Sequence, residues 1–120
     1  KIYELVSRIM AVKYEVIGKS LTSSSQTSLL TAPAKQQLII KSIRVSTMGV
    51  FTPSITFEVT DTSASATYTI ERLKVLVGNQ TIELLTNPVV LEESDILKVT
   101  STTTDQLDIV ISYMAVAQNE

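Results

Sequence analysis

LDIVISY, the sequence of residues 107–113, places an apolar side chain at every second position. A β-strand points successive side chains to opposite faces, so this spacing predicts a strand with one buried face. ITFEV, residues 55–59, repeats the pattern. Short runs of this kind recur along the chain between turn residues. We therefore predict an all-β chain, a jelly-roll-like β-sandwich of eight or nine short antiparallel strands.

The expected strands carry several local signals. Gly18 interrupts the first alternation, residues 12–16, and apolar residues on both parities near Ile39 predict burial on both faces. A parity slip at residues 71–72 predicts a bulge or a strand that changes sheets, and the Gly-Asn pair at residues 78–79 predicts a hairpin turn. The expected strands are residues 12–16, 28–31, 37–47, 54–60, 66–77, 81–85, 89–91, 96–102 and 107–116.

The 120 residues suffice for one domain. We assign residues 11–120 to the sandwich and residues 1–10 to an N-terminal arm. This arm is short and uncapped, so a free helix there would be marginal. We expect it either to lie on a neighbouring molecule or to lead into the first strand. Its apolar residues fall at helical spacing, at Ile2, Leu5, Val6 and Ile9.

The chain contains neither cysteine nor histidine. It therefore lacks the commonest catalytic base, the commonest metal ligand and the thiol nucleophile, and we expect no enzyme, no cofactor and no metal. Glu92, Glu93 and Asp95 could offer oxygen ligands to Ca²⁺, but their spacing lacks the glycine and terminal glutamate of a calcium loop. A solvated turn explains this cluster better.

Charge and hydropathy narrow the expected partners. The net charge of −2 argues against nucleic acid as a partner. No apolar run approaches the roughly 18 residues of a membrane span, and the first ten residues are not typical of a signal peptide. Seven cationic residues precede position 45, whereas acidic residues dominate after it. This asymmetry fits either the pairing of early and late strands or head-to-tail contacts between identical subunits.

The segment at residues 48–51 is unusually apolar for a loop. It either folds over one end of the sandwich or anchors an interface with another subunit. The four tyrosines are scattered, so we expect core or rim packing rather than a sugar-stacking platform. Our candidate partner-interface residues come from the arm and this loop: Ile2, Tyr3, Leu5, Ile9, Met48, Val50 and Phe51.

Several stretches resemble small jelly-roll virion proteins of tailed bacteriophages, of the marine and cyanobacterial type. MAVKYEVIGKS at residues 10–20 resembles their opening, and TSLLTAPA at residues 27–34 and IKSIRV at residues 40–45 continue the resemblance. LEESDILKV at residues 91–99 resembles their acidic turn and following strand, and ISY at residues 111–113 their closing strand.

The resemblance implies a structural module present in many copies, and it carries over no catalytic residues. The favoured interpretation is a capsid decoration (cement) protein on the outer surface of the virion. Such a protein would form homo-oligomers, with a homotrimer favoured, and bind across neighbouring subunits of the major capsid protein. The alternatives are a neck, tail or baseplate accessory protein of the same fold, or a carbohydrate-binding adhesin.

Overall fold

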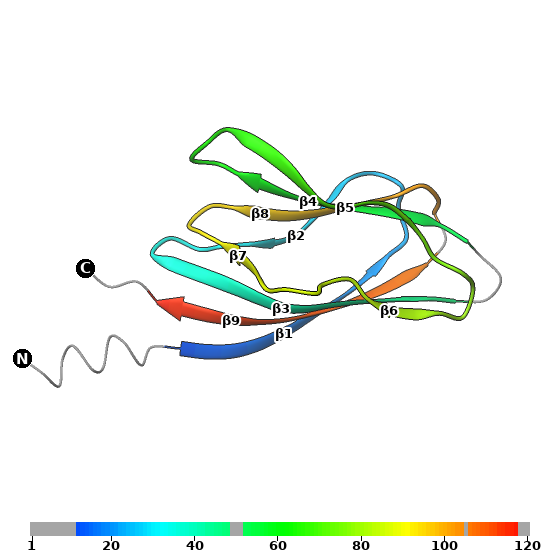
Figure 1. Cartoon of the computed structure of the whole chain (residues 1–120), viewed down its shortest axis with the longest axis horizontal. Coiled ribbons are helices and arrows are strands. Elements are labelled where there is room, and N and C mark those ends of the chain that lie inside the picture. The colour runs from blue at the N-terminus through cyan, green and yellow to red at the C-terminus, as the bar shows by residue number, and fades with distance from the viewer. Residues whose placement is uncertain (1–11, 49–51, 105, 118–120) are drawn as a thin grey trace, which may run out of the picture.

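The computed structural model describes residues 12–48, 52–104 and 106–117, and these residues form nine strands (Figure 1). The predicted all-β fold is therefore confirmed. The proposed arm at residues 1–10 lies outside the described residues. The strands are β1 (Val12–Leu21), β2 (Thr27–Thr31), β3 (Gln36–Thr47), β4 (Ser54–Asp61), β5 (Ala66–Val75), β6 (Thr81–Glu83), β7 (Val89–Leu91), β8 (Ile96–Ser101) and β9 (Leu107–Ala117).

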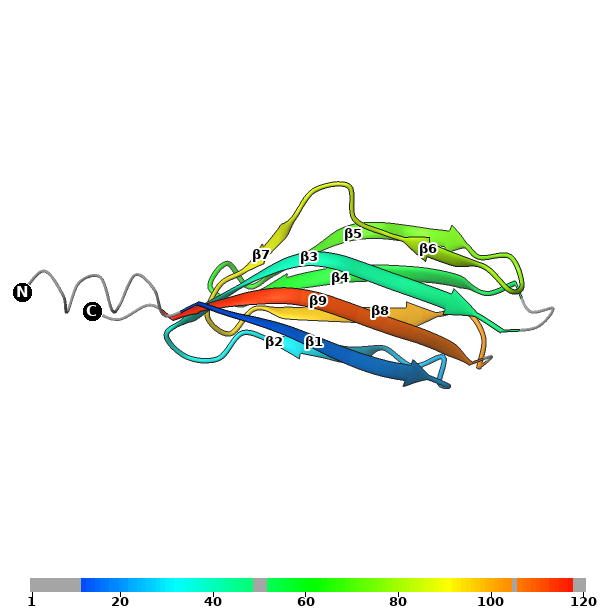
Figure 2. The ribbon, with the colours of Figure 1, turned by 90° about the horizontal axis from the view of Figure 1, so that it is seen from below.

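The strands form two antiparallel sheets packed face to face (Figure 2). The first sheet has the order β1-β9-β3-β6, with β7 also paired to β3, and the second has the order β2-β8-β4-β5. The first and last strands are neighbours, since β1 pairs with β9 from Val12↔Val116 to Leu21↔Leu107. The predicted jelly-roll-like sandwich is thus confirmed. No helix among the described residues is long and apolar enough to cross a membrane.

One hydrophobic core lies between the sheets. In β9, every second side chain from Leu107 to Tyr113 is buried, as the alternation predicts, and Ile55 and Phe57 of β4 face them from the other sheet. Burying side chains of this size contributes roughly 1.5–3 kcal/mol each. The remaining fully buried large side chains are Leu21, Ile40, Ile43, Val45, Leu76, Leu91 and Leu97.

The first expected strand continues past Gly18, so the predicted interruption is wrong. Gly18 pairs with Val110 and the ladder runs on to Leu21. Gly18 is exposed, and a Cβ placed there would meet only the Ile109 carbonyl oxygen at 4.0 Å. Burial on both faces near Ile39 is also wrong: Ile40 is buried, but Ile39 is only half-buried because nothing in the described chain covers the outer face.

The predicted irregularity in β5 is a bulge. The β4–β5 register shifts between Ile55 and Glu58, and Leu73 takes a positive φ of 49°, with its backbone N–H donating to Thr56 Oγ1 at 3.0 Å. The predicted hairpin at residues 78–79 is wrong, although Asn79 does have the positive φ of a turn. The chain there crosses between sheets, because β5 pairs with β4 whereas β6 pairs with β3.

Candidate assembly surface

The outer face of the first sheet carries a row of apolar side chains across four strands. Tyr14 of β1 pairs with Met114 of β9, Met114 pairs with Ile39 of β3, and Ile39 pairs with Val90 of β7. These residues alternate with buried ones on their strands, so their side chains point away from the core. The register therefore builds one continuous apolar row on the surface.

Neighbouring residues widen this row into a patch. Tyr14 is 77% exposed and Val16 is 65% exposed, while Ile39, Met114 and Val116 are half-buried by one another and by the sheet. A contiguous apolar area of a few hundred Å² is the largest that a typical monomer exposes, and such areas commonly mark interaction sites. We call this surface the outer apolar patch: Val12, Tyr14, Val16, Ile39, Val90, Met114 and Val116.

The orientation of β1 is fixed by what its other face buries. Ile17 packs against the core, and Glu15 accepts a hydrogen bond of 2.7 Å from the hydroxyl of the buried Tyr113. Desolvation, this hydrogen bond and the Glu15 charge together raise the pKa of Tyr113 to about 12. Since side chains alternate along a strand, these contacts turn Tyr14 and Val16 outward.

Polar side chains occupy much of the outer face of the second sheet. The hydroxyls of Thr60 and Thr67 are 3.1 Å apart on the paired strands β4 and β5. The Gln26 amide donates to Glu58 Oε1 at 2.8 Å, and the Arg72 guanidinium donates to Thr69 Oγ1 at 2.9 Å. Leu73 and Val75 near the end of β5 are nevertheless exposed, so the second sheet also carries apolar side chains on its edge strand. The apolar row of the first sheet differs in running without a break across four strands.

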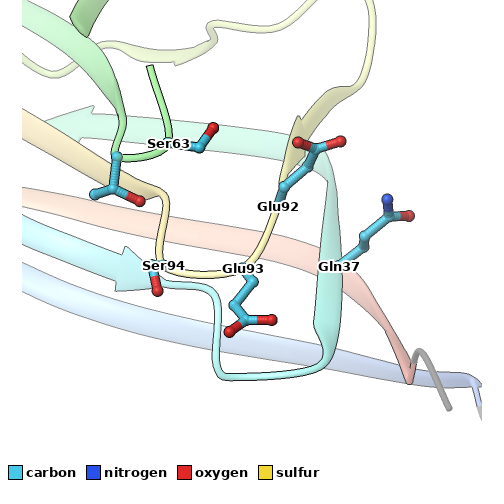
Figure 3. Close-up of a pocket in the computed structure, with 6 residues that line it drawn as sticks. Gln37, Ser63, Glu92, Glu93 and Ser94 are labelled. Carbon is cyan, nitrogen blue, oxygen red and sulfur yellow. The ribbon is translucent and has the colours of Figure 1, made fainter. Parts of the chain in front are cut away.

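An acidic rim borders the outer apolar patch beside β7. Leu38 pairs with Leu91, so Glu92 follows next to Gln37, and Figure 3 shows both side chains with Glu93 around a shallow depression. The depression has a volume of about 520 Å³ and is also lined by Thr62, Ser63 and Ser94. Glu92 and Glu93 are exposed, and Glu93 Oε1 accepts a hydrogen bond of 3.1 Å from the backbone N–H of Lys35.

Asp95 departs from the predicted solvated turn. It is buried, and its carboxylate accepts hydrogen bonds from the backbone N–H groups of Thr62 (3.3 Å) and Glu92 (3.0 Å). It therefore ties the turn before β8 to the turn after β4. Within residues 12–48, 52–104 and 106–117, no three acidic side chains gather closely enough to hold a metal ion.

Most of the predicted interface residues lie outside the described part of the chain. Met48 is described: it follows β3 and is 52% exposed. Because β3 and β1 both pair antiparallel with β9, Met48 lies at the end of the sandwich opposite Val12. The residues outside the described part are Ile2, Tyr3, Leu5, Ile9, Val50 and Phe51.

The expectation of core or rim packing holds for only one of the three described tyrosines. Tyr113 is buried, but Tyr14 and Tyr68 are exposed, on β1 and β5 of different sheets. These two rings therefore do not form a joint platform for a sugar. Sequence reasoning missed Tyr14 as a surface residue because the side of β1 that faces inward carries Lys13, Glu15 and Lys19. These polar residues give no sign that they lie on the buried face.

Comparisons with known proteins address the fold alone. No family model matches the sequence, and no curated protein matches it significantly. A structure of Bacillus endospore appendages, described as disulfide-linked pili, is similar with a TM-score of 0.56 and 8% identity, over 91% of this chain and 90% of that one.

Two further structures show weaker similarity. The Drosophila NLP core, described in terms of pentamer formation and histone binding, has a TM-score of 0.48 and 18% identity over 83% of this chain and 97% of that one. A pentameric capsid protein from metagenomic phage sequences has a TM-score of 0.41 and 12% identity over 85% and 60%. At 8% identity, the likeness to the spore appendage structure shows the fold alone, a jelly-roll-like β-sandwich.

Proposed function

We propose that this chain is a non-enzymatic structural protein of a tailed-phage virion, most specifically a capsid decoration protein. In this role, its copies associate with one another and bind across neighbouring subunits of the major capsid protein on the outer shell. The sequence resemblance to small phage virion proteins motivates the identity. The observation that carries the assembly role is the continuous apolar row that the strand register builds across four strands on the outer face of the first sheet.

The outer apolar patch supports an assembly role because exposed apolar area is costly to leave in water. Tyr14 alone exposes most of a side chain that buries on the order of 150–250 Å² when covered. The described residues supply no covering element. A subunit in an assembly gains from such a face, since each copy contributes a modest interface and many copies make the attachment multivalent.

The two ends of the sandwich suit different contacts in this proposal. The outer apolar patch lies toward the end where β1 begins and β9 ends, whereas Met48 lies at the other end. β3 runs between these ends over twelve residues, roughly 40 Å. One end is therefore free to join copies while the other contacts the coat.

Labelled antibodies against the purified protein, applied to purified tailed-phage particles that encode it, test the proposal. We expect label distributed over the capsid shell. Label confined to the neck, tail or baseplate would instead establish an accessory protein of the same fold. Particles without label would refute a virion role.

A binding assay with particles stripped of the protein tests the coat contact. We expect Phe51→Ser in the apolar loop to lower occupancy, and Ser63→Ala, a matched control at the opposite end, to leave occupancy unchanged. Equal occupancy for wild type and Phe51→Ser would refute the role of the loop.

A further inference from the structure

We infer that the outer apolar patch binds the N-terminal segment, residues 1–11, of a second copy of this chain. This inference deepens the proposed assembly role and rests on it. Four features carry it: the size of the patch, the charge of its rim, the spacing of apolar residues in the segment, and the composition of the chain just before β1.

The size of the patch favours a short segment over a whole second face. A stable interface between two folded faces buries about 800 Å² on each partner. Seven side chains, three of them already half-buried, offer roughly 300–600 Å², the range of the largest apolar patch on a typical monomer. Two outer apolar patches pressed together therefore fall short, whereas an eleven-residue segment needs no larger surface.

The dimensions of the two surfaces match. The row from Tyr14 to Val90 crosses four strands, which spans about 14 Å at the usual strand spacing. The segment places Ile2, Leu5, Val6 and Ile9 at helical spacing, an apolar stripe about 12 Å long when helical. An isolated helix of this length is marginal in water, so packing on the patch would supply its stability.

The charges are complementary as well. Residues 1–11 contain the cations Lys1 and Arg8 and one carboxylate, Glu4. Beside the patch, two residues after Val90, lies the exposed carboxylate of Glu92, and Glu93 follows it in the turn before β8. The segment has a net positive charge and the side of the apolar row carries negative charge. This attraction orients the bound segment more than it increases the affinity.

The composition before β1 favours a second copy over the chain's own sheet. To cover the patch of its own copy, the segment would have to reverse direction just before Val12. Residues 8–13 contain no Gly, Pro, Asn, Asp or Ser, the residues that make tight turns. This composition offers no tight turn through which the segment could fold back, so we expect it to reach a neighbouring copy.

The edge of β1 is a poorer docking site than the face. β1 is an edge strand, open to pairing with another chain, but Lys13 and Lys19 project on its inner parity. Inward-pointing charges on an edge strand discourage the addition of a further strand. The partner segment therefore covers the face of the sheet rather than extending it.

The test uses purified full-length protein without particles, so its outcome is independent of the particle labelling. Two variants are made: Leu5→Glu, which disrupts the segment, and Tyr14→Ser, which disrupts the patch. Light scattering during size-exclusion chromatography, over a concentration series, measures the mass. Tyr68→Ser is the matched control, an exposed tyrosine on the other sheet.

We expect wild type and Tyr68→Ser to form a closed oligomer. Leu5→Glu and Tyr14→Ser should each weaken association roughly 10–100-fold, as the loss of one buried apolar side chain implies. Mixing the two variants should restore a one-to-one heterodimer, because one keeps an intact patch and the other an intact segment. Far-UV circular dichroism should be the same for all variants.

Three results would overturn the inference. A monomeric wild type would mean that no second copy occupies the patch. An oligomeric Leu5→Glu would show that the faces associate without the segment. Two monomeric variants that fail to complement would show that the segment and the patch are not each other's partners.

Discussion

Replacing Tyr113 with phenylalanine removes the hydroxyl that donates to Glu15 across 2.7 Å. A hydrogen bond to a charged group contributes roughly 1.5–3 kcal/mol. The Glu15 side chain is 38% exposed, so water can solvate its carboxylate in the variant. We therefore expect the lower end of this range, a loss of about 1.5 kcal/mol in the free energy of unfolding at neutral pH.

The same substitution changes the alkaline limb of stability. The pKa of Tyr113 is raised from 10.0 to about 12, so the unfolded chain loses this proton first. The stability that the protonated Tyr113 hydroxyl adds to the folded protein is fully present below pH 10. It is lost as the pH rises through 12, by up to about 1.4 kcal/mol per pH unit. Wild type and Tyr113→Phe should therefore reach equal stability near pH 11, by this order-of-magnitude reckoning.

Urea unfolding followed by far-UV circular dichroism between pH 7 and 12 measures both effects without relying on tyrosine fluorescence. Tyr68→Phe is the control, since its ring is 60% exposed and we expect a change below about 0.5 kcal/mol. A Tyr113→Phe protein as stable as wild type at pH 7 would refute the hydrogen-bond argument. A difference that stays constant up to pH 12 would refute the linkage argument.

Phe57→Ala should lower the free energy of unfolding by roughly 3–5 kcal/mol in urea titrations, because Phe57 is fully buried; a loss below 1 kcal/mol would contradict its place in the core. Asp95→Ala should cost about 1–3 kcal/mol by leaving two backbone N–H groups without their acceptor, whereas the exposed Glu92→Gln should stay near wild type. Leu73→Asn should raise the melting temperature, since asparagine tolerates the positive φ that costs leucine about 1 kcal/mol, and calorimetry showing a lower value would refute this account. Ser20→Ala should flatten the loss of stability below pH 4, because the Ser20 hydroxyl is the first cause, ahead of Gln106, that lowers the pKa of Asp108; an unchanged acid limb would count against it.

The sequence predicts the strands that have one face on the core. In β4 and β9 the alternation coincides with burial, because every second side chain points into the core. In β1 the alternation predicts a strand, but it does not predict which side of the strand faces the core. Val12, Tyr14 and Val16 form the more apolar parity, yet the inner face is set by the distant partners of Glu15 and Ile17.

Local sequence signals do not predict which strands pair with one another. The Gly-Asn pair at residues 78–79 correctly predicts a turn, but not that the chain there passes from one sheet to the other. The outer apolar patch is also invisible in the sequence, since it joins residues from β1, β3, β7 and β9 that only long-range pairing brings together. The apolar loop at residues 48–51 stays a prediction, because Val50 and Phe51 lie outside the described residues.

The pairing of β1 with β9 delays completion of the fold during synthesis. Leu21 leaves the ribosome long before its partner Leu107 is made, an interval of several seconds at ordinary elongation rates. Until then, the first strand has no ladder partner, and the larger sheet cannot close. The larger sheet is therefore completed only once β9 has been synthesised, and a chain truncated before β9 would lack the strand that joins β1 to β3.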